Sequence, residues 1–221
     1  AFDAERLTLD FRLDLGAWPA AVAAHPDGRR AFVTHLSGRT VDIIDTRRGR
    51  REGALELPDK GTGLPGRLLG RGQQKRHANL AIAATVSPGG KRLFVAHTMV
   101  DTGDNLAAVG VVQGGYGLGS AAPIVASVSS FDLESGKLVR PNPNFNDGSA
   151  DIGWISRSDQ AAQRLAQPMA VVHDPKRARL LMVAHGSDTL MSLDTTSLDP
   201  FTEPLGAYQT GHAPRGAVIS R

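Results

Sequence analysis

The feature that most constrains the fold is an internal repeat, in which one pattern of short apolar runs and turns occurs three times within 221 residues. The first copy spans 18–49 and reads WPAAVAAHPDGRRAFVTHLSGRTVDIIDTRRG. Its apolar runs have the length of strands and are bounded by Gly, Pro, Asp and Ser. The second copy begins LAIAATVSPGGKRLFVAH and resumes as SVSSFDLESG, and the third reads PMAVVHDPKRARLLMVAHGSDTLMSLDTTS. Each copy therefore predicts one small sheet of short strands.

Repeats of about 40–50 residues built from four strands are typical of β-propeller blades. We therefore predict an all-β fold, a partial β-propeller with about three and a half four-stranded blades of a ring of roughly seven. The boundaries expected are an outer closing strand at 1–16, blades at 17–60, 77–140 and 166–208, and the start of a further blade at 212–221. The blade at 77–140 carries a long insertion. An open arc would leave unpaired edges, so we expect the remaining blades in cis or on a companion chain.

The first apolar run of each copy predicts an innermost strand, because its small residues fit the crowded centre of a propeller. These strands are expected at 20–24, 82–86, 169–172 and 216–219. One helix is expected in SDQAAQRLA, where Ser158 or Asp159 can cap the first turn and the residues that follow favour helix. The long connections 57–76, 98–124 and 140–167 all fall on one face of the predicted blades. Loops on a rigid scaffold often carry binding, so this face is the functional candidate.

Five histidines are expected on or near that face, either closing second strands or preceding first strands: His35, His97, His185, His77 and His212. Imidazole suits copper and zinc, so these side chains are candidate metal ligands. The alternative is that each repeated histidine bonds a neighbouring blade or the repeated aspartate. Three equivalent copies favour this architectural role, since a site normally breaks the symmetry of a repeat.

Two groups of acidic residues admit a catalytic or metal-binding interpretation. Asp45, Asp132 and Asp194 each end a third strand, and a carboxylate that accepts backbone N–H groups in the following turn explains them. The segment DTGDN offers Asp101, Asp104 and Asn105 as calcium ligands. It lacks the remainder of an EF-hand loop, so a simple turn is the favoured interpretation.

Composition excludes several classes of function. The chain has no cysteine, which excludes disulfides, thiolate metal sites and covalent haem attachment within these residues. The net charge is only +3, and two Trp and two Tyr do not provide the stacking platform of a nucleic-acid binder. No window is apolar for the roughly 20 residues of a membrane span. The signatures of common hydrolases are also absent.

Several segments resemble a known family of propeller repeats. HPDGRRAFVTH, SPGGKRLFVAH, TVDIIDTRRG and TLMSLDTTS are similar to YVTN-type repeats, although the family's usual Asn at the end of the second strand is His in all three copies. A narrower resemblance, on TGHAPRGAVISR and GGYGLGSAAP, is to bacterial proteins in which such a propeller precedes a di-haem cytochrome c domain of peroxidase type. That resemblance implies haem c on another domain or partner, and a periplasmic or extracellular location.

Two classes of function follow from these features. The first is a docking propeller associated with a c-type cytochrome or another periplasmic redox partner. The second is a propeller enzyme with a histidine-bound metal of the copper type, or a small-molecule site, at the mouth of the central channel. An oxidoreductase activity would then belong to a larger protein, because this chain contains no catalytic motif. Neither nucleic acid nor a membrane is expected as a partner.

Overall fold

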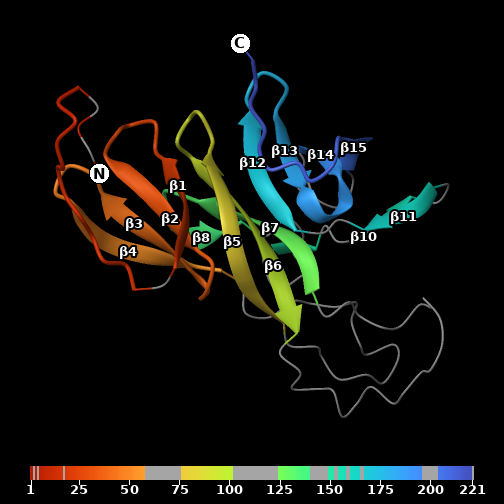
Figure 1. Ribbon diagram of the computed structural model, residues 1–221, viewed down its shortest axis with the longest axis horizontal. Coiled ribbons are helices and arrows are strands. Elements are labelled where there is room, and N and C mark those ends of the chain that lie inside the picture. Colours follow the sequence, from red (N-terminus) through yellow and green to blue (C-terminus); the bar gives the residue numbers. More distant parts are fainter. Residues whose placement is uncertain are drawn as a thin grey trace.

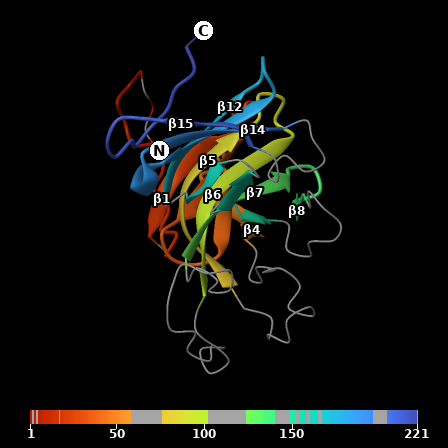
Figure 2. The same ribbon diagram turned by 90° about the vertical axis from the view of Figure 1, so that its right-hand side faces the viewer.

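The computed structural model describes residues 1, 3, 5–16, 18–57, 76–101, 124–139, 149–151, 154–157, 160–164, 167–195 and 204–220. Strands dominate this part of the chain, and its one helical element is the three-residue 3-10 turn η3 (His185–Ser187). Figure 1 shows three sheets side by side, and in Figure 2 the same sheets lie one behind another. The predicted all-β fold and its partial β-propeller architecture are confirmed.

Each sheet is a blade whose strands pair in the order of the sequence. Blade 1 comprises β1 (Pro19–Ala24), β2 (Arg30–His35), β3 (Thr40–Asp45) and β4 (Arg50–Glu56). Blade 2 comprises β5 (Arg76–Val86), β6 (Arg92–Asp101), β7 (Ile124–Asp132) and β8 (Lys137–Leu138), with β9 (Ser149–Asp151) also on β7. Blade 3 comprises β12 (Pro168–Asp174), β13 (Arg179–Ala184), β14 (Thr189–Asp194) and β15 (Pro204–Gln209).

The predicted helix after Ser158 is wrong for the residues that the structure describes there. Strand β11 (Gln160–Arg164) pairs antiparallel with β10 (Trp154–Arg157). Alanine and glutamine favour helix, but intrinsic propensity is worth less than about 1 kcal/mol per residue, and pairing with a neighbouring segment overrides it.

The innermost strands are those predicted in each of the three blades. Strands β1, β5 and β12 form one edge of their sheets, and β5 contacts both of the others. Residues 214–220, by contrast, form no strand. The blade that this segment was predicted to begin is not among the described strands, so its role stays a prediction.

Two apolar clusters join the blades. Phe32 of blade 1 packs with Leu93 and Phe131 of blade 2, while Phe94 of blade 2 packs with Met182 of blade 3. All five side chains are fully buried, and burial of each contributes about 1.5–3 kcal/mol. The two faces of blade 2 are therefore both covered, and the three blades form one continuous arc.

The N-terminal segment lies against blade 1 at Gly49. The ring of Phe11 is so close that a Cβ on Gly49 would lie 2.8 Å from its Cγ, and Gly49 also has a φ of +59°, which favours glycine. Residues 5–16 contain no extended strand. The outer-strand role predicted for 1–16 needs a blade beyond those described, so it stays a prediction.

Candidate functional site

The two faces of the arc differ in their connections. One face, which we call the tight-turn face, carries the short connections 25–29, 46–49, 87–91, 133–136 and 175–178, each of four or five residues. The connection between β14 and β15, 195–203, is longer. The strands that border 57–75 and 102–123 end or begin at the opposite face, which we call the long-connection face, and β12 begins there after 139–167. The strand ends thus separate short connections from long ones as the sequence predicts. Because loops on a rigid scaffold often carry binding, the long-connection face is the first candidate for a binding site.

One repeated position near the long-connection end of the innermost strands is of interest. The pairing of each innermost strand with its neighbour shifts register once, between Pro19 and Ala21, between Asn79 and Ala83, and between Pro168 and Ala170. Bulges of this kind re-aim the neighbouring side chain. Trp18 and Gln167 come directly before the strands β1 and β12, and Leu80 lies within the irregular part of β5. Each of the three stands the same number of residues before the turn that follows its strand.

These three positions, which we call the mouth positions, include two that are connected to each other through the backbone. The carbonyl of Trp18 accepts from the N–H of Leu36 at 2.7 Å, and the carbonyl of Leu36 accepts from the N–H of Leu80 at 3.2 Å. In blade 3 the carbonyl of Gln167 accepts from the N–H of His185 at 2.9 Å. Backbone hydrogen bonds through Leu36 therefore hold Trp18 and Leu80 in place relative to each other, and Gln167 is held within its own blade.

The side chains at the mouth positions are exposed. Trp18 is 72% exposed and Leu80 is 41% exposed, and Gln167 also faces solvent. Leu80 and Gln167 have φ of +49° and +53°, a region that non-glycine residues seldom occupy and that costs about 1–3 kcal/mol. An exposed Trp and an exposed Leu at equivalent positions of blades 1 and 2 form a candidate docking patch, which the sequence reasoning missed.

Two of the predicted histidines, His35 and His97, occupy equivalent positions. Both are fully buried in a second strand. His35 ends β2 as expected, whereas His97 lies within β6, which continues to Asp101. The Nε2–H of His35 donates to Oδ2 of Asp42 at 3.2 Å. In blade 2, Nε2 of His97 accepts from the hydroxyl of Ser129 at 2.8 Å, and Ser129 stands where Asp42 stands in blade 1. The repeated histidine thus bonds the third strand of its own blade.

The electrostatics of these two sites differ. Burial lowers the pKa of His97 to about 4, so its ring is neutral at pH 7, with Nδ1–H donating to the carbonyl of Thr98. In blade 1, Oδ1 of Asp42 also binds Arg51, whose Nε and Nη2 both lie at 2.8 Å. Asp42 is thus a buried carboxylate shared by an imidazole and a guanidinium, a second group that sequence reasoning missed.

The third repeated histidine, His185, is not equivalent to the other two. Arg92 pairs with Asp132, and Arg179 pairs with Asp194, so these two pairs are equivalent in blades 2 and 3. Counted from them, the residue of blade 3 that is equivalent to His97 is Ala184. Blade 3 has one more residue between its turn and its histidine, so His185 falls after the strand, in η3. The expectation of three equivalent histidines was therefore wrong for His185.

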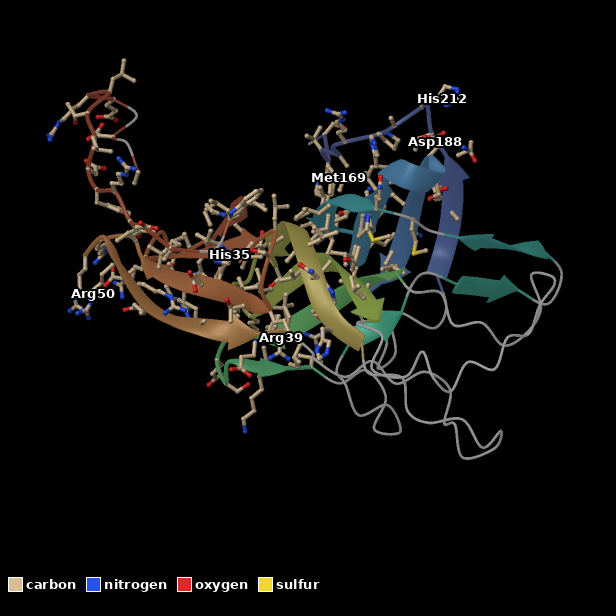
Figure 3. The ribbon with its side chains drawn as sticks, turned by 60° about the horizontal axis from the view of Figure 1, so that its bottom comes forward. His35, Arg39, Arg50, Met169, Asp188 and His212 are labelled. Atoms are coloured by element: carbon tan, nitrogen blue, oxygen red, sulfur yellow. The ribbon has the colours of Figure 1, made fainter. Side chains whose placement is uncertain are left out.

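The remaining candidate ligands lie apart. His77 is part of β5, where it pairs with Val100, and Nδ1 of the exposed His212 lies 3.1 Å from Oδ2 of Asp188. Oδ1 of Asp188 accepts from the N–H of Ala213 at 2.7 Å, the main reason that the pKa of this carboxyl is lowered. Figure 3 shows Asp188 and His212 together at one end of blade 3, away from His35.

No three His, Asp or Glu side chains gather into a potential metal site in the part of the chain that the structure describes. The histidine-bound metal therefore stays a prediction, which metal analysis of the purified protein would test. Asp101 is the last residue of β6, whereas Asp104 and Asn105 lie outside the described residues, so the calcium interpretation also stays a prediction.

The turn aspartates have the structural role predicted for them where their side chains are described. Oδ1 of Asp45 accepts from the N–H groups of Arg47 and Arg48, and Oδ1 of Asp132 accepts from the N–H and hydroxyl of Ser135. The pKa of Asp45 is lowered mainly by the Arg48 N–H, and that of Asp132 by the Ser135 hydroxyl. Asp194 has the equivalent backbone position opposite Arg179.

Comparison with known proteins supports the fold and nothing narrower. No protein-family model matches the chain, and no curated protein matches it significantly. Among solved structures, the nidogen/laminin complex matches with a TM-score of 0.51 and 13% identity over 93% of this chain and 53% of the other. Hydrazine synthase of Kuenenia stuttgartiensis (TM-score 0.43, 16%, 97% and 69%) and the periplasmic gluconolactonase of Pseudomonas aeruginosa (0.49, 16%, 92% and 43%) match less closely in shape. The chain thus spans between two fifths and about two thirds of these proteins.

No helix in the described ranges is both long and apolar enough to cross a membrane.

Proposed function

We propose that this chain is a docking propeller that binds a partner protein at the mouth positions of its long-connection face. The observation that carries the proposal is the exposure of Trp18 and Leu80 at equivalent, backbone-tied positions. Tryptophan is the residue type most enriched at the energetic centre of protein interfaces. A solvent-facing Trp on a rigid strand end contributes contact area with little loss of side-chain freedom on binding.

The partner that we propose is a c-type cytochrome or another periplasmic redox protein. This choice is supported by the resemblance of TGHAPRGAVISR and GGYGLGSAAP to propellers that precede di-haem cytochrome domains. With it we propose that the repeats are of the YVTN type, that the remaining blades are in cis or on a companion chain, and that the protein is periplasmic. Any oxidoreductase activity would reside in the complete assembly.

The test measures binding of a soluble c-type cytochrome to the immobilised chain. Trp18→Ala is expected to weaken binding about tenfold, and Leu80→Ala by a smaller factor, because each substitution removes apolar contact area at the centre of the patch. Leu7→Ala is the matched control, since Leu7 is 81% exposed but belongs to the N-terminal segment. Thermal unfolding of each variant separates lost contacts from lost structure.

A second readout uses the intact protein. Haem quenches nearby indole fluorescence, so a cytochrome bound at the mouth should quench Trp18 in a saturable manner. The proposal is contradicted if Trp18→Ala and Leu80→Ala bind the cytochrome as tightly as the unmodified chain.

A further inference from the structure

We infer that the tight-turn face of blade 1 is a second docking surface, which binds an acidic protein surface through clustered arginines. The arginine cluster consists of Arg29, Arg30, Arg47, Arg48, Arg50 and Arg51. It lies at the opposite ends of the strands from the mouth positions, so it is independent of the function proposed above.

The two turns that carry the cluster are joined to each other. The N–H of Thr46 donates to the carbonyl of Arg29 at 2.9 Å, and its hydroxyl donates to the carbonyl of Gly28 at 2.8 Å. Arg30 pairs across the sheet with Asp45, which in turn pairs with Arg50. The arginines that are distant in sequence are therefore held on one surface by backbone contacts.

Only part of this positive charge is compensated. Nη1 of Arg48 lies 3.6 Å from Oδ2 of Asp45, and Nη2 of Arg30 lies 3.9 Å from Oδ2 of Asp27. Nη2 of Arg51 lies 2.8 Å from Oδ1 of Asp42. In the described ranges, no carboxylate lies within ion-pair distance of the guanidinium groups of Arg29, Arg47 and Arg50.

These three side chains are exposed. Figure 3 shows Arg50 at the outer end of blade 1, pointing away from the sheet. The cluster thus presents guanidinium groups that no carboxylate of the described chain neutralises.

The turn itself does not need these arginines. Blade 2 has the same turn, with Gly136 at a φ of +68° where Gly49 has +59°, and with Asp132 accepting from the backbone as Asp45 does. At the positions of the four arginines that follow Asp45, however, blade 2 has Glu134, Ser135, Lys137 and Leu138. The cluster breaks the symmetry of the repeat without changing its backbone, which is expected of a recognition surface.

The chemistry of the cluster favours carboxylates on a protein. Guanidinium groups match carboxylates in a bidentate geometry, and at exposed sites such pairs set the orientation and rate of association. Neither turn contains Phe, Tyr or Trp: 25–30 reads HPDGRR and 45–51 reads DTRRGRR. Phe11, which lies against Gly49, is partly buried, and His25 is buried. Single-stranded nucleic acids are bound by basic grooves interleaved with aromatic side chains, an arrangement that these turns lack.

The test uses a labelled poly-glutamate peptide and the complete chain, with binding followed by fluorescence anisotropy at low and at physiological salt. The variant Arg47→Glu/Arg50→Glu is expected to weaken binding about tenfold at low salt. The matched control is Lys91→Glu/Lys137→Glu, which makes the same change of charge at the equivalent turns of blade 2 and is expected to weaken binding less than about twofold.

Two outcomes overturn the inference. If both double variants weaken binding equally, the peptide responds to net charge and blade 1 has no special surface. If the unmodified chain binds an oligonucleotide or anionic vesicles more tightly than poly-glutamate, and Arg47→Glu/Arg50→Glu abolishes that binding, the partner is of another class. Arg47→Gln/Arg50→Gln serves as a milder variant if charge reversal disturbs folding.

Discussion

Blades 1 and 2 place a histidine at the same buried position but surround it differently. In blade 1, His35 bonds the carboxylate of Asp42, which also binds Arg51. In blade 2, His97 bonds the hydroxyl of Ser129 and stays neutral. The repeat preserves a hydrogen bond between the second and third strands, while the charge of its members has changed.

Blade 3 extends the comparison, because it has Ala184 and Met191 at these positions, both fully buried. The polar pair can thus be replaced by apolar side chains in the same fold. Replacement of a buried polar pair as a whole is often neutral, whereas removal of one member leaves the other unsatisfied. The blades therefore differ in how their stability responds to single substitutions and to pH.

The largest expected effect is that of Asp42→Ala, which leaves His35 and Arg51 without their shared acceptor. We expect a loss of about 3 kcal/mol in the free energy of unfolding, measured by urea denaturation at pH 7. Asp42→Asn keeps an acceptor and removes the charge, so it should cost less. Equal losses for both substitutions would show that the charge carries the stabilisation and that the hydrogen bond does not.

The second effect concerns pH. The pKa of His97 is about 4 in the folded chain and 6.5 in the unfolded chain. Between pH 4 and pH 6.5 the unfolded state therefore binds more protons than the folded state. Stability is complete above about pH 6.5 and falls as the pH decreases toward about 4. The loss between pH 7 and pH 5 is about 2 kcal/mol.

The variant His97→Gln is the test of this pH dependence. Urea unfolding of the variant at both pH values should show a smaller difference than the unmodified chain shows. An unchanged difference would mean that another group causes the loss. The turn aspartates Asp45 and Asp132 do not contribute to this loss of stability between about pH 7 and pH 5. Their pKa values are lowered from the ordinary carboxyl value of 3.8, so their protonation lowers stability only below about pH 3.8.

The smallest effect is that of Ser129→Ala, which removes one neutral hydrogen bond from the buried ring of His97. We expect a loss of about 1 kcal/mol, measured under the same conditions as Asp42→Ala. The ratio of the losses for Asp42→Ala and Ser129→Ala compares the stability contributed by the charged pair of blade 1 with that contributed by the neutral pair of blade 2. A larger loss for Ser129→Ala than for Asp42→Ala would reverse the comparison.

Local signals made the blades predictable. Turn residues such as Pro26 and Gly28 mark the ends of short apolar runs, and repetition of that pattern fixed the sheets and their order. The position of His185 was missed because the histidine lies one residue further from its turn than His35 and His97 do, so Ala184 ends the strand and His185 follows it.

The mouth and the arginine cluster depended on contacts that sequence patterns do not carry. The copies of the repeat already align Trp18 with Leu80, but the exposure of the two side chains depends on how the strands pair and pack. The basic run RRGRR reads as a solvated turn until the backbone joins it to Arg29. Registers and neighbours between distant segments are set by tertiary packing, which local propensity does not determine.

The uneven lengths of the connections have a consequence for the order of folding. The second and third strands are joined by residues 36–39 in blade 1 and 185–188 in blade 3, but by 102–123 in blade 2. Closing the longer loop costs about 1.5 kcal/mol more chain entropy. The hairpins of blades 1 and 3 should consequently form sooner, and blade 2, which is packed on both sides in the native arc, should be the last to close, so that assembly proceeds from the flanks toward the middle.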